Sequence, residues 1–255
     1  METLTPRCAT DTDREFSRGP EAGCRGTLQP RMPPSSTVEN YLKAIYQAEI
    51  AHGDEGALVP MGRLASALHV VPGTATTMVK ALADSGLVRY EPYAGVRLTP
   101  AGQKLAALVL RRHRLIELFL VKVLGMSWAE VHDEAERLEH AASDRLIDRI
   151  DAMLGRPAVD PHGDPIPDPD GAIARPRYQS LLTCPLDTPV VLTRVTDQDA
   201  EFLRFLESQD LTPGQSIRVA VRDAAADHVQ VRIAPDRPVM IGMRAAAKLL
   251  VAPRG

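Results

Sequence analysis

The chain has 255 residues, with 30 Lys and Arg against 33 Asp and Glu and a formal net charge of −3. This length suits two or three small domains, and the total charge is mild evidence against a nucleic-acid binder, although the acidic residues concentrate between positions 130 and 170. Three scattered cysteines and the lack of any apolar run near the roughly 18 residues of a membrane span exclude a disulfide framework and a transmembrane helix. We therefore expect a cytoplasmic protein without a membrane partner.

Residues 1–36 form the first distinct segment. They are rich in Pro, Gly, Arg and Ser and contain few large apolar residues. Such a composition cannot bury enough surface to offset the entropy of ordering, so the sequence predicts a disordered tail.

Residues 37–99 alternate helical periodicity with turn signals. In order, the predicted elements are a helix over 37–51, a helix opened by Pro60, a helix over 74–85 that ends at Gly86, and strands over 87–91 and 95–99. This order is typical of a winged helix-turn-helix domain. The alternative is a small α+β domain with no role in DNA binding.

The third predicted helix favours DNA binding. Its first turns carry hydroxyl groups and a lysine, and the hairpin carries two arginines, Arg89 and Arg97. Hydroxyls at a helix N-terminus suit phosphates and base edges, and basic hairpin residues suit the DNA backbone. The candidate DNA-binding residues are Thr74, Thr76, Thr77, Lys80 and Arg97.

The remainder of the chain predicts a helical domain and a small β-domain, so that the whole is mainly α with a small β part. Two long helices over 100–124 and 127–154 carry more apolar residues than one winged helix can cover, which predicts a homodimer interface within a domain over 100–167. A proline-rich stretch over 156–177 reads as a linker, and we bound the linker between the helical domain and the next domain at 168–182. Short alternating strands over 183–253 predict a small β-barrel.

The clearest chemical pattern lies on the two long helices. Imidazoles and carboxylates recur there at helical spacing, which is how helical proteins build metal sites. The residues are His113 and Glu117 on the first helix, and His132, Glu136, Glu139 and His140 on the second. We expect His132, Glu136 and His140 to form one stripe on a single helix. The alternative is a solvated polar helix face.

From Thr37 to about Pro167 the sequence resembles the diphtheria toxin repressor and manganese transport regulator family of metal-dependent repressors. The segments that carry the resemblance are TVENYLKAIYQAE, VPGTATTMVKALADSGLV, LTPAGQKLA, RRHRLIELFL, VHDEAERLEH and DPHGDPIP. Residues 183–253 resemble the SH3-like, FeoA-type barrel of this family. The resemblance implies a winged helix-turn-helix domain, a helical dimerisation and metal-binding domain, and this barrel.

The resemblance also implies two metal sites. His113, Glu117 and His132 match one of them. Glu136, Glu139 and His140 match the other, together with a ligand at the position of Asn40 in the helix over 37–51. The barrel is expected to add oxygen ligands, for which Asp199 and Glu201 are candidates.

Three positions bear on the choice of metal. Manganese members of the family usually have Asp at the position of Asn40, whereas iron members have Met there. Iron members have Cys at the position of Glu136, and a hard carboxylate favours Mn(II) over Fe(II). Some manganese members place a metal-bridging Glu near Lys43, which a lysine cannot replace, so we expect two separate sites.

The resemblance therefore implies a transcriptional repressor that is not an enzyme. Metal would clamp the helix over 37–51 onto the dimerisation helices. The metal-loaded homodimer would bind palindromic double-stranded operator DNA and control metal-uptake genes. We expect Mn(II), with Fe(II) as the alternative within the family. Two alternatives from other classes are a helical di-metal carboxylate enzyme and a dimer that senses a small organic molecule; the latter leaves the Glu/His pattern unexplained.

Overall fold

The computed structural model describes residues 35–52, 57–233 and 236–254. Nearly all of the predicted tail, residues 1–36, lies outside the described residues, and the first helix already begins at Ser36. No helix in the described ranges is long and apolar enough to cross a membrane.

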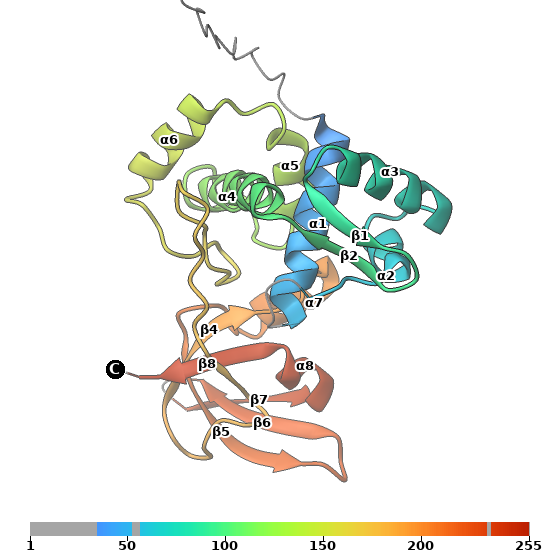
Figure 1. Ribbon diagram of the computed structural model, residues 1–255. Coiled ribbons are helices and arrows are strands. Elements are labelled where there is room, and N and C mark those ends of the chain that lie inside the picture. Colours follow the sequence, from blue (N-terminus) through green and yellow to red (C-terminus); the bar gives the residue numbers. More distant parts are fainter. Residues whose placement is uncertain (1–34, 53–56, 234–235, 255) are drawn as a thin grey trace, which may run out of the picture. The chain divides into compact units, whose positions relative to one another are not determined.

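The first domain is a three-helix unit with a hairpin, as the sequence predicts (Figure 1). Its elements are α1 (Ser36–His52), α2 (Met61–Ala67), α3 (Pro72–Asp84), β1 (Val88–Glu91) and β2 (Gly95–Leu98). The antiparallel hairpin gains a third segment where Val59 bridges Val96. The winged helix-turn-helix order is thus confirmed.

Local sequence explains where these helices start and what they bury. On α1, Leu42 and Ile45 are completely buried, and this apolar face packs against the following long helix. Proline occupies the first turn of α3 at Pro72, where a missing N–H costs nothing. Thr99 caps the next helix, because its side chain accepts a hydrogen bond from Gly102 N at 3.2 Å.

The helical domain differs from the sequence-based prediction in its second half. The helix α4 (Pro100–Lys122) is long, as expected, but the predicted helix over 127–154 is divided into α5 (Val131–Leu138) and α6 (Asp144–Met153). Ser143 causes the division, because it is extended and its side chain caps α6 by accepting a hydrogen bond from Leu146 N. The single stripe predicted for His140 is therefore wrong, since α5 ends before that residue.

The proline-rich stretch after α6 begins as a buried segment. Residues 162–167 are buried, and the backbone carbonyl of Pro167 accepts a hydrogen bond from Arg111 at 2.7 Å. Asp160 shapes the turn by accepting hydrogen bonds from the backbone nitrogens of His162 and Asp164. An exposed linker begins only near Asp168, so our reading of the whole stretch as a linker is wrong for its first part.

The C-terminal domain is a six-stranded antiparallel sheet in the order β3-β8-β4-β5-β6-β7. The strands are β3 (Gln179–Ser180), β4 (Val190–Val195), β5 (Ser216–Asp223), β6 (His228–Ile233), β7 (Arg237–Gly242) and β8 (Leu249–Pro253). Two helices accompany them, α7 (Ala200–Ser208) and α8 (Met243–Ala247). The last strand, β8, pairs with both β3 and β4.

The segment that joins α4 to α5 contributes to the core of this sheet. Trp128 and Ala129 belong to the same buried apolar cluster as the strands. Gly163 approaches β4 so closely that an added Cβ would lie 1.9 Å from the Thr193 carbonyl oxygen, and its φ is +85°. The sheet therefore supports the turn that carries Asp160 and His162.

Candidate metal centre

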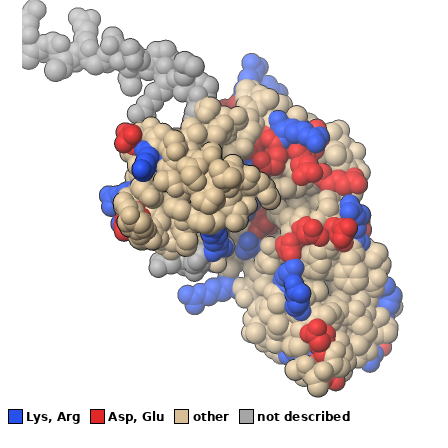
Figure 2. Space-filling view, turned by 90° about the vertical axis from the view of Figure 1, so that its right-hand side faces the viewer, with Lys and Arg blue, Asp and Glu red and all other residues tan. Residues whose placement is uncertain are grey.

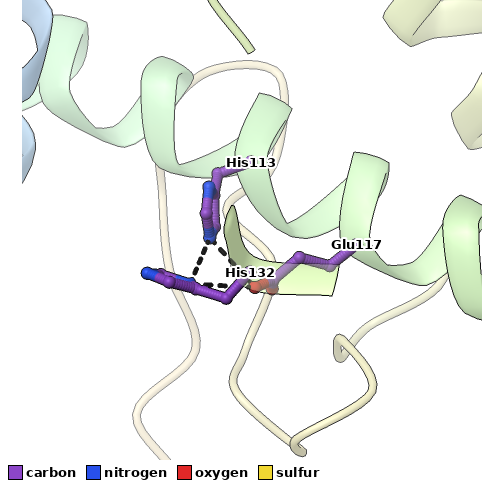
Figure 3. A group of neighbouring side chains, drawn as sticks. All are labelled: His113, Glu117 and His132. Carbon is purple, nitrogen blue, oxygen red and sulfur yellow. Dashed lines mark hydrogen bonds and ion pairs between the residues drawn. The ribbon is translucent and has the colours of Figure 1, made fainter. Parts of the chain in front are cut away.

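Helices α4 and α5 bring three predicted ligands together. His113 Nε2 lies 3.0 Å from Glu117 Oε1 and 3.2 Å from His132 Nδ1, and His132 Nδ1 lies 3.3 Å from the same Glu117 oxygen. Figure 3 shows the three side chains pointing toward one another. His113 and Glu117 are one helical turn apart and buried, so the backbone of α4 fixes both. The structure thus brings together the three residues predicted for the first site.

A second group shares His113. Its Nδ1 lies 2.7 Å from Glu139 Oε2, and the ligand atoms of His113, Glu136 and Glu139 all lie within 4.8 Å of one another. Lys43 of α1 is already bound to this group, since its Nζ lies 2.5 Å from Glu136 Oε1 and 2.7 Å from Glu139 Oε1. The structure thus places a buried ammonium group between two predicted metal ligands.

His140 and Asn40 lie at the edge of the second group. His140 Nε2 is 3.3 Å from Glu139 Oε1, while His140 Nδ1 is 2.6 Å from Glu39 Oε2 on α1. The Asn40 Oδ1 atom is buried and has no hydrogen-bond partner among the described residues. Glu39 was not among the residues singled out from the sequence.

A third group was also missed. Glu117, Asp160 and His162 are all buried, and their ligand atoms lie within 4.8 Å of one another. His162 Nε2 lies 2.9 Å from the Trp128 carbonyl oxygen, which leaves Nδ1 facing Glu117 Oε2 at 3.9 Å. The DPHG sequence contains both added residues, but the prolines around it predict a linker.

The electrostatics of these groups follow from burial and close pairing. Burial lowers the pKa of His113, but the charge of Glu117 and hydrogen bonds to Glu117 and Glu139 outweigh it and raise the pKa to about 9. Burial raises the pKa of Glu117, but the paired His113 outweighs this effect and holds that pKa well below its ordinary range. Burial likewise raises the pKa of Glu139, but the hydrogen bond to His113 and the charge of Lys43 lower it overall. Burial and the charges of Asp164 and Glu117 raise the pKa of Asp160.

The donor set fits a divalent metal ion. Buried polar atoms normally have hydrogen-bond partners, yet several ligand atoms in or beside these groups have no hydrogen-bond partner among the described residues. These atoms are Asn40 Oδ1, Glu117 Oε2, His140 Nε2, Asp160 Oδ2 and His162 Nδ1. Imidazole nitrogens and carboxylate oxygens are ligands that Mn(II), Fe(II) and Zn(II) all accept.

The barrel residues proposed as further ligands do not join these groups. The Asp199 side chain caps α7 by accepting a hydrogen bond from Phe202 N at 2.9 Å, and Glu201 is exposed. The sheet instead contacts the turn that carries Asp160 and His162. Val195 N donates a hydrogen bond to the His162 carbonyl oxygen at 2.9 Å, and Arg194 forms an ion pair with Asp164.

The candidate DNA-binding residues lie on α3 and the hairpin. Thr74, Thr77 and Lys80 are exposed, and the Thr77 hydroxyl donates to the Gly73 carbonyl oxygen at 3.0 Å. The side chain of Thr76 is half-buried, and Arg97 is half-buried and paired with Glu91 at 3.1 Å. On the face drawn in Figure 2, basic side chains are scattered among acidic ones and form no continuous basic patch.

Comparison with known families matches nearly the whole described chain. The N-terminal DNA-binding domain of iron-dependent repressors matches residues 35–96, their metal-binding and dimerisation domain matches residues 99–168, and the FeoA domain matches residues 179–253. These matches agree with the three domains described above.

Individual relatives cover similar lengths. The iron-dependent repressor IdeR of Mycobacterium leprae is 32% identical over 209 residues, which cover 77% of this chain and 88% of the relative. The diphtheria toxin repressor of Corynebacterium diphtheriae is 36% identical over 199 residues, covering 73% and 85%. A solved manganese-dependent transcriptional repressor in complex with manganese is 40% identical with a TM-score of 0.76, covering 84% of this chain and 99% of that one. A crystal structure of ScaR with bound Zn2+ has a TM-score of 0.68 at 30% identity, covering 85% and 99%.

Proposed function

Because the chain belongs to the diphtheria toxin repressor and manganese transport regulator family of metal-dependent, DNA-binding transcriptional repressors, we propose that it responds to Mn(II). Its relatives are repressors and not enzymes. The proposal extends to a homodimer that binds a palindromic operator near metal-uptake genes. The observation that carries the choice of metal is the carboxylate of Glu136 beside Glu139 and His113.

The donors favour a hard cation. Each group combines imidazole nitrogens with carboxylate oxygens and contains no sulfur. Oxygen donors suit Mn(II), whereas thiolate and thioether ligands select softer metals. One of the solved relatives is described as a complex with manganese, which supports the same choice.

We assign the ligands to two sites. His113, Glu117 and His132 would hold one ion, and Glu136, Glu139, His140 and Asn40 would hold the other. A divalent ion there supplies positive charge among carboxylates that come from separate elements. Because Asn40 lies on α1 and Glu139 follows α5, filling the second site would hold α1 against the helical domain.

The position of α1 matters for DNA binding because its apolar face shares a core with α3. Leu42 and Ile45 belong to the same buried cluster as Val79 of α3. A shift of α1 would therefore move the recognition helix. Metal acts as an allosteric effector if it stabilises the spacing of the two recognition helices that matches successive major grooves of DNA.

Dimerisation is supported by exposed apolar residues on α5 and α6. Leu138, Leu146 and Met153 are 40%, 50% and 66% exposed. Leu146 and Met153 are two turns apart and so lie on one face of α6. Their burial against a second copy would agree with the matched dimerisation domain.

The proposal is tested by measuring binding to the DNA upstream of the protein's own gene by fluorescence anisotropy. Chelator, Mn(II), anaerobic Fe(II) and Zn(II) are compared at buffered free concentrations, with a shuffled DNA as control. We expect no specific binding with chelator, and specific binding with Mn(II) at a lower free concentration than with Fe(II). Activation by Fe(II) at a lower free concentration than Mn(II) would overturn the manganese assignment, and metal-independent binding would overturn the whole mechanism.

A further inference from the structure

One carboxylate of α1 contacts a predicted metal ligand without joining the ligand groups. Glu39 is only 4% exposed, and its Oε2 lies 2.6 Å from His140 Nδ1. Its other oxygen, Oε1, accepts a hydrogen bond from Arg112 Nη1 at 3.3 Å. Both carboxylate oxygens of Glu39 are therefore engaged.

The opposite side of the His140 ring is different. His140 Nε2 is buried and has no hydrogen-bond partner among the described residues, although Glu139 Oε1 lies 3.3 Å away. One ring nitrogen is thus paired with a carboxylate, and the other is left facing a predicted metal ligand. A metal-bound histidine usually has this arrangement, because the hydrogen bond at one nitrogen decides which nitrogen binds the metal.

We propose that Glu39 is a positioning residue that fixes the tautomer and orientation of His140, so that Nε2 is the nitrogen presented to the metal. The inference rests on the proposed function and extends it to how metal occupancy reaches the DNA-binding domain. With Nδ1–H donated to Glu39, Nε2 carries the free lone pair. The negative charge of Glu39 also makes the ring a better electron donor.

The same contact links the metal site to α1. Coordination of a metal at Nε2 would withdraw electron density from the ring and would strengthen Nδ1–H as a donor to Glu39. Arg112 of α4 reinforces this link, because its Nη1 also donates to the Glu139 backbone oxygen at 3.4 Å. Glu39, Arg112 and His140 thereby connect α1, α4 and the turn after α5.

The decisive variant is Glu39→Gln, which preserves side-chain size but removes the charge and the requirement for Nδ1–H. The matched control is Glu49→Gln on the same helix, since Glu49 is 2% exposed and accepts a hydrogen bond from Leu98 N at 2.8 Å, away from the metal groups. Co(II) is titrated into each full-length protein and followed by its visible absorption. We expect Glu39→Gln to weaken Co(II) binding about 10- to 100-fold, and Glu49→Gln to leave it unchanged.

A second readout separates positioning from general destabilisation. Long-range ¹⁵N–¹H spectra of the metal-free protein, recorded with chelator present, report which His140 nitrogen carries the proton. We expect a protonated Nδ1 in the wild type and in Glu49→Gln, and a mixture of tautomers in Glu39→Gln. Unchanged Co(II) affinity and an unchanged tautomer in Glu39→Gln would overturn the inference, as would equal weakening in Glu49→Gln. Failure of the wild type to bind DNA in a metal-dependent way would instead refute the proposed function.

Discussion

Lys43 Nζ lies 2.7 Å from Glu139 Oε1, and this buried ion pair joins α1 to the residue that ends α5. The Lys43 side chain is 6% exposed and the Glu139 side chain is fully buried. Because Glu136 contacts the same ammonium group, a protein cation lies where we expect the ligands of a metal ion. Metal binding to Glu136 and Glu139 must therefore displace or share this contact.

We expect Lys43→Met to strengthen Mn(II) binding by about 10-fold or more, because one competing charge inside the site is worth at least the 1.4 kcal/mol of a tenfold change. The metal-free protein should also lose stability, by about 3–5 kcal/mol, because the two carboxylates lose their buried partner. Competition with a fluorescent chelator measures the first effect and thermal unfolding the second. Lys122→Met, which removes an exposed lysine at the end of α4, is the control. Weaker Mn(II) binding by Lys43→Met would show that the ammonium group orders the carboxylates instead.

Glu139→Gln should abolish metal-dependent operator binding while the protein remains a folded dimer. Glu139 contacts both His113 and Lys43, so its charge is shared by the predicted metal site and the link to α1. Size-exclusion chromatography and circular dichroism test folding, and anisotropy tests DNA binding over a range of Mn(II). The site assignment is wrong if the variant binds DNA with the metal dependence of the wild type.

Binding of metal to His113 should release a proton at neutral pH. The ordinary pKa of 6.5 is raised to about 9, so the metal-free protein holds the proton that the metal must replace. Mn(II) affinity should therefore rise with pH up to about 9. Calorimetry in buffers of different ionisation enthalpy measures the proton count, and His113→Gln should abolish that release. Release of no proton at pH 7 would contradict the assignment.

The same shift affects the stability of the metal-free protein. The folded-state pKa lies above the unfolded value, so the stabilisation from His113 is complete below pH 6.5 and is lost as pH rises through 9. Denaturant unfolding with chelator present should show this loss between these pH values. In His113→Gln this part of the pH dependence should be absent.

Two variants of α3 should separate positioning from sequence reading. Lys80→Ala should weaken binding to all DNA sequences and reduce the slope of log affinity against log salt by about one unit, because it removes one phosphate contact. Thr77→Ala should change the preference among operator sequences and leave that slope intact. Neither variant should alter Mn(II) affinity. If both bind DNA like the wild type, another surface contacts the operator.

The sequence predicted those parts of the site that depend on local spacing. His113 and Glu117 are one turn apart on a long helix, so their shared face followed from periodicity. The winged helix likewise followed from Pro60, Gly86 and the turn between two short strands. Elements of this kind are determined by neighbours in the chain.

Contacts between distant segments could not be predicted in this way. The break before α6 depends on Ser143 acting as a helix cap, a signal that the continued helical pattern concealed. The pairing of Glu39 with His140 spans 101 positions, and His162 is buried beside a sheet whose strands come later in the sequence. Only the three-dimensional packing shows that these polar residues meet.

The choice of metal is tested by changing the two positions at which the donor set departs from the iron and manganese members of the family. Glu136→Cys replaces a hard oxygen with sulfur, so we expect activation to shift from Mn(II) towards Fe(II). Asn40→Asp replaces a neutral oxygen with a charged one of the same reach, and because Asn40 Oδ1 is buried without a partner, the new charge should tighten Mn(II) binding. Competitive titrations of wild type and both variants with Mn(II) and anaerobic Fe(II) measure these changes, and Asn40→Ala serves as the control for loss of the oxygen. A wild type that already prefers Fe(II), with Glu136→Cys unchanged from it, would show that the carboxylate of Glu136 does not select manganese.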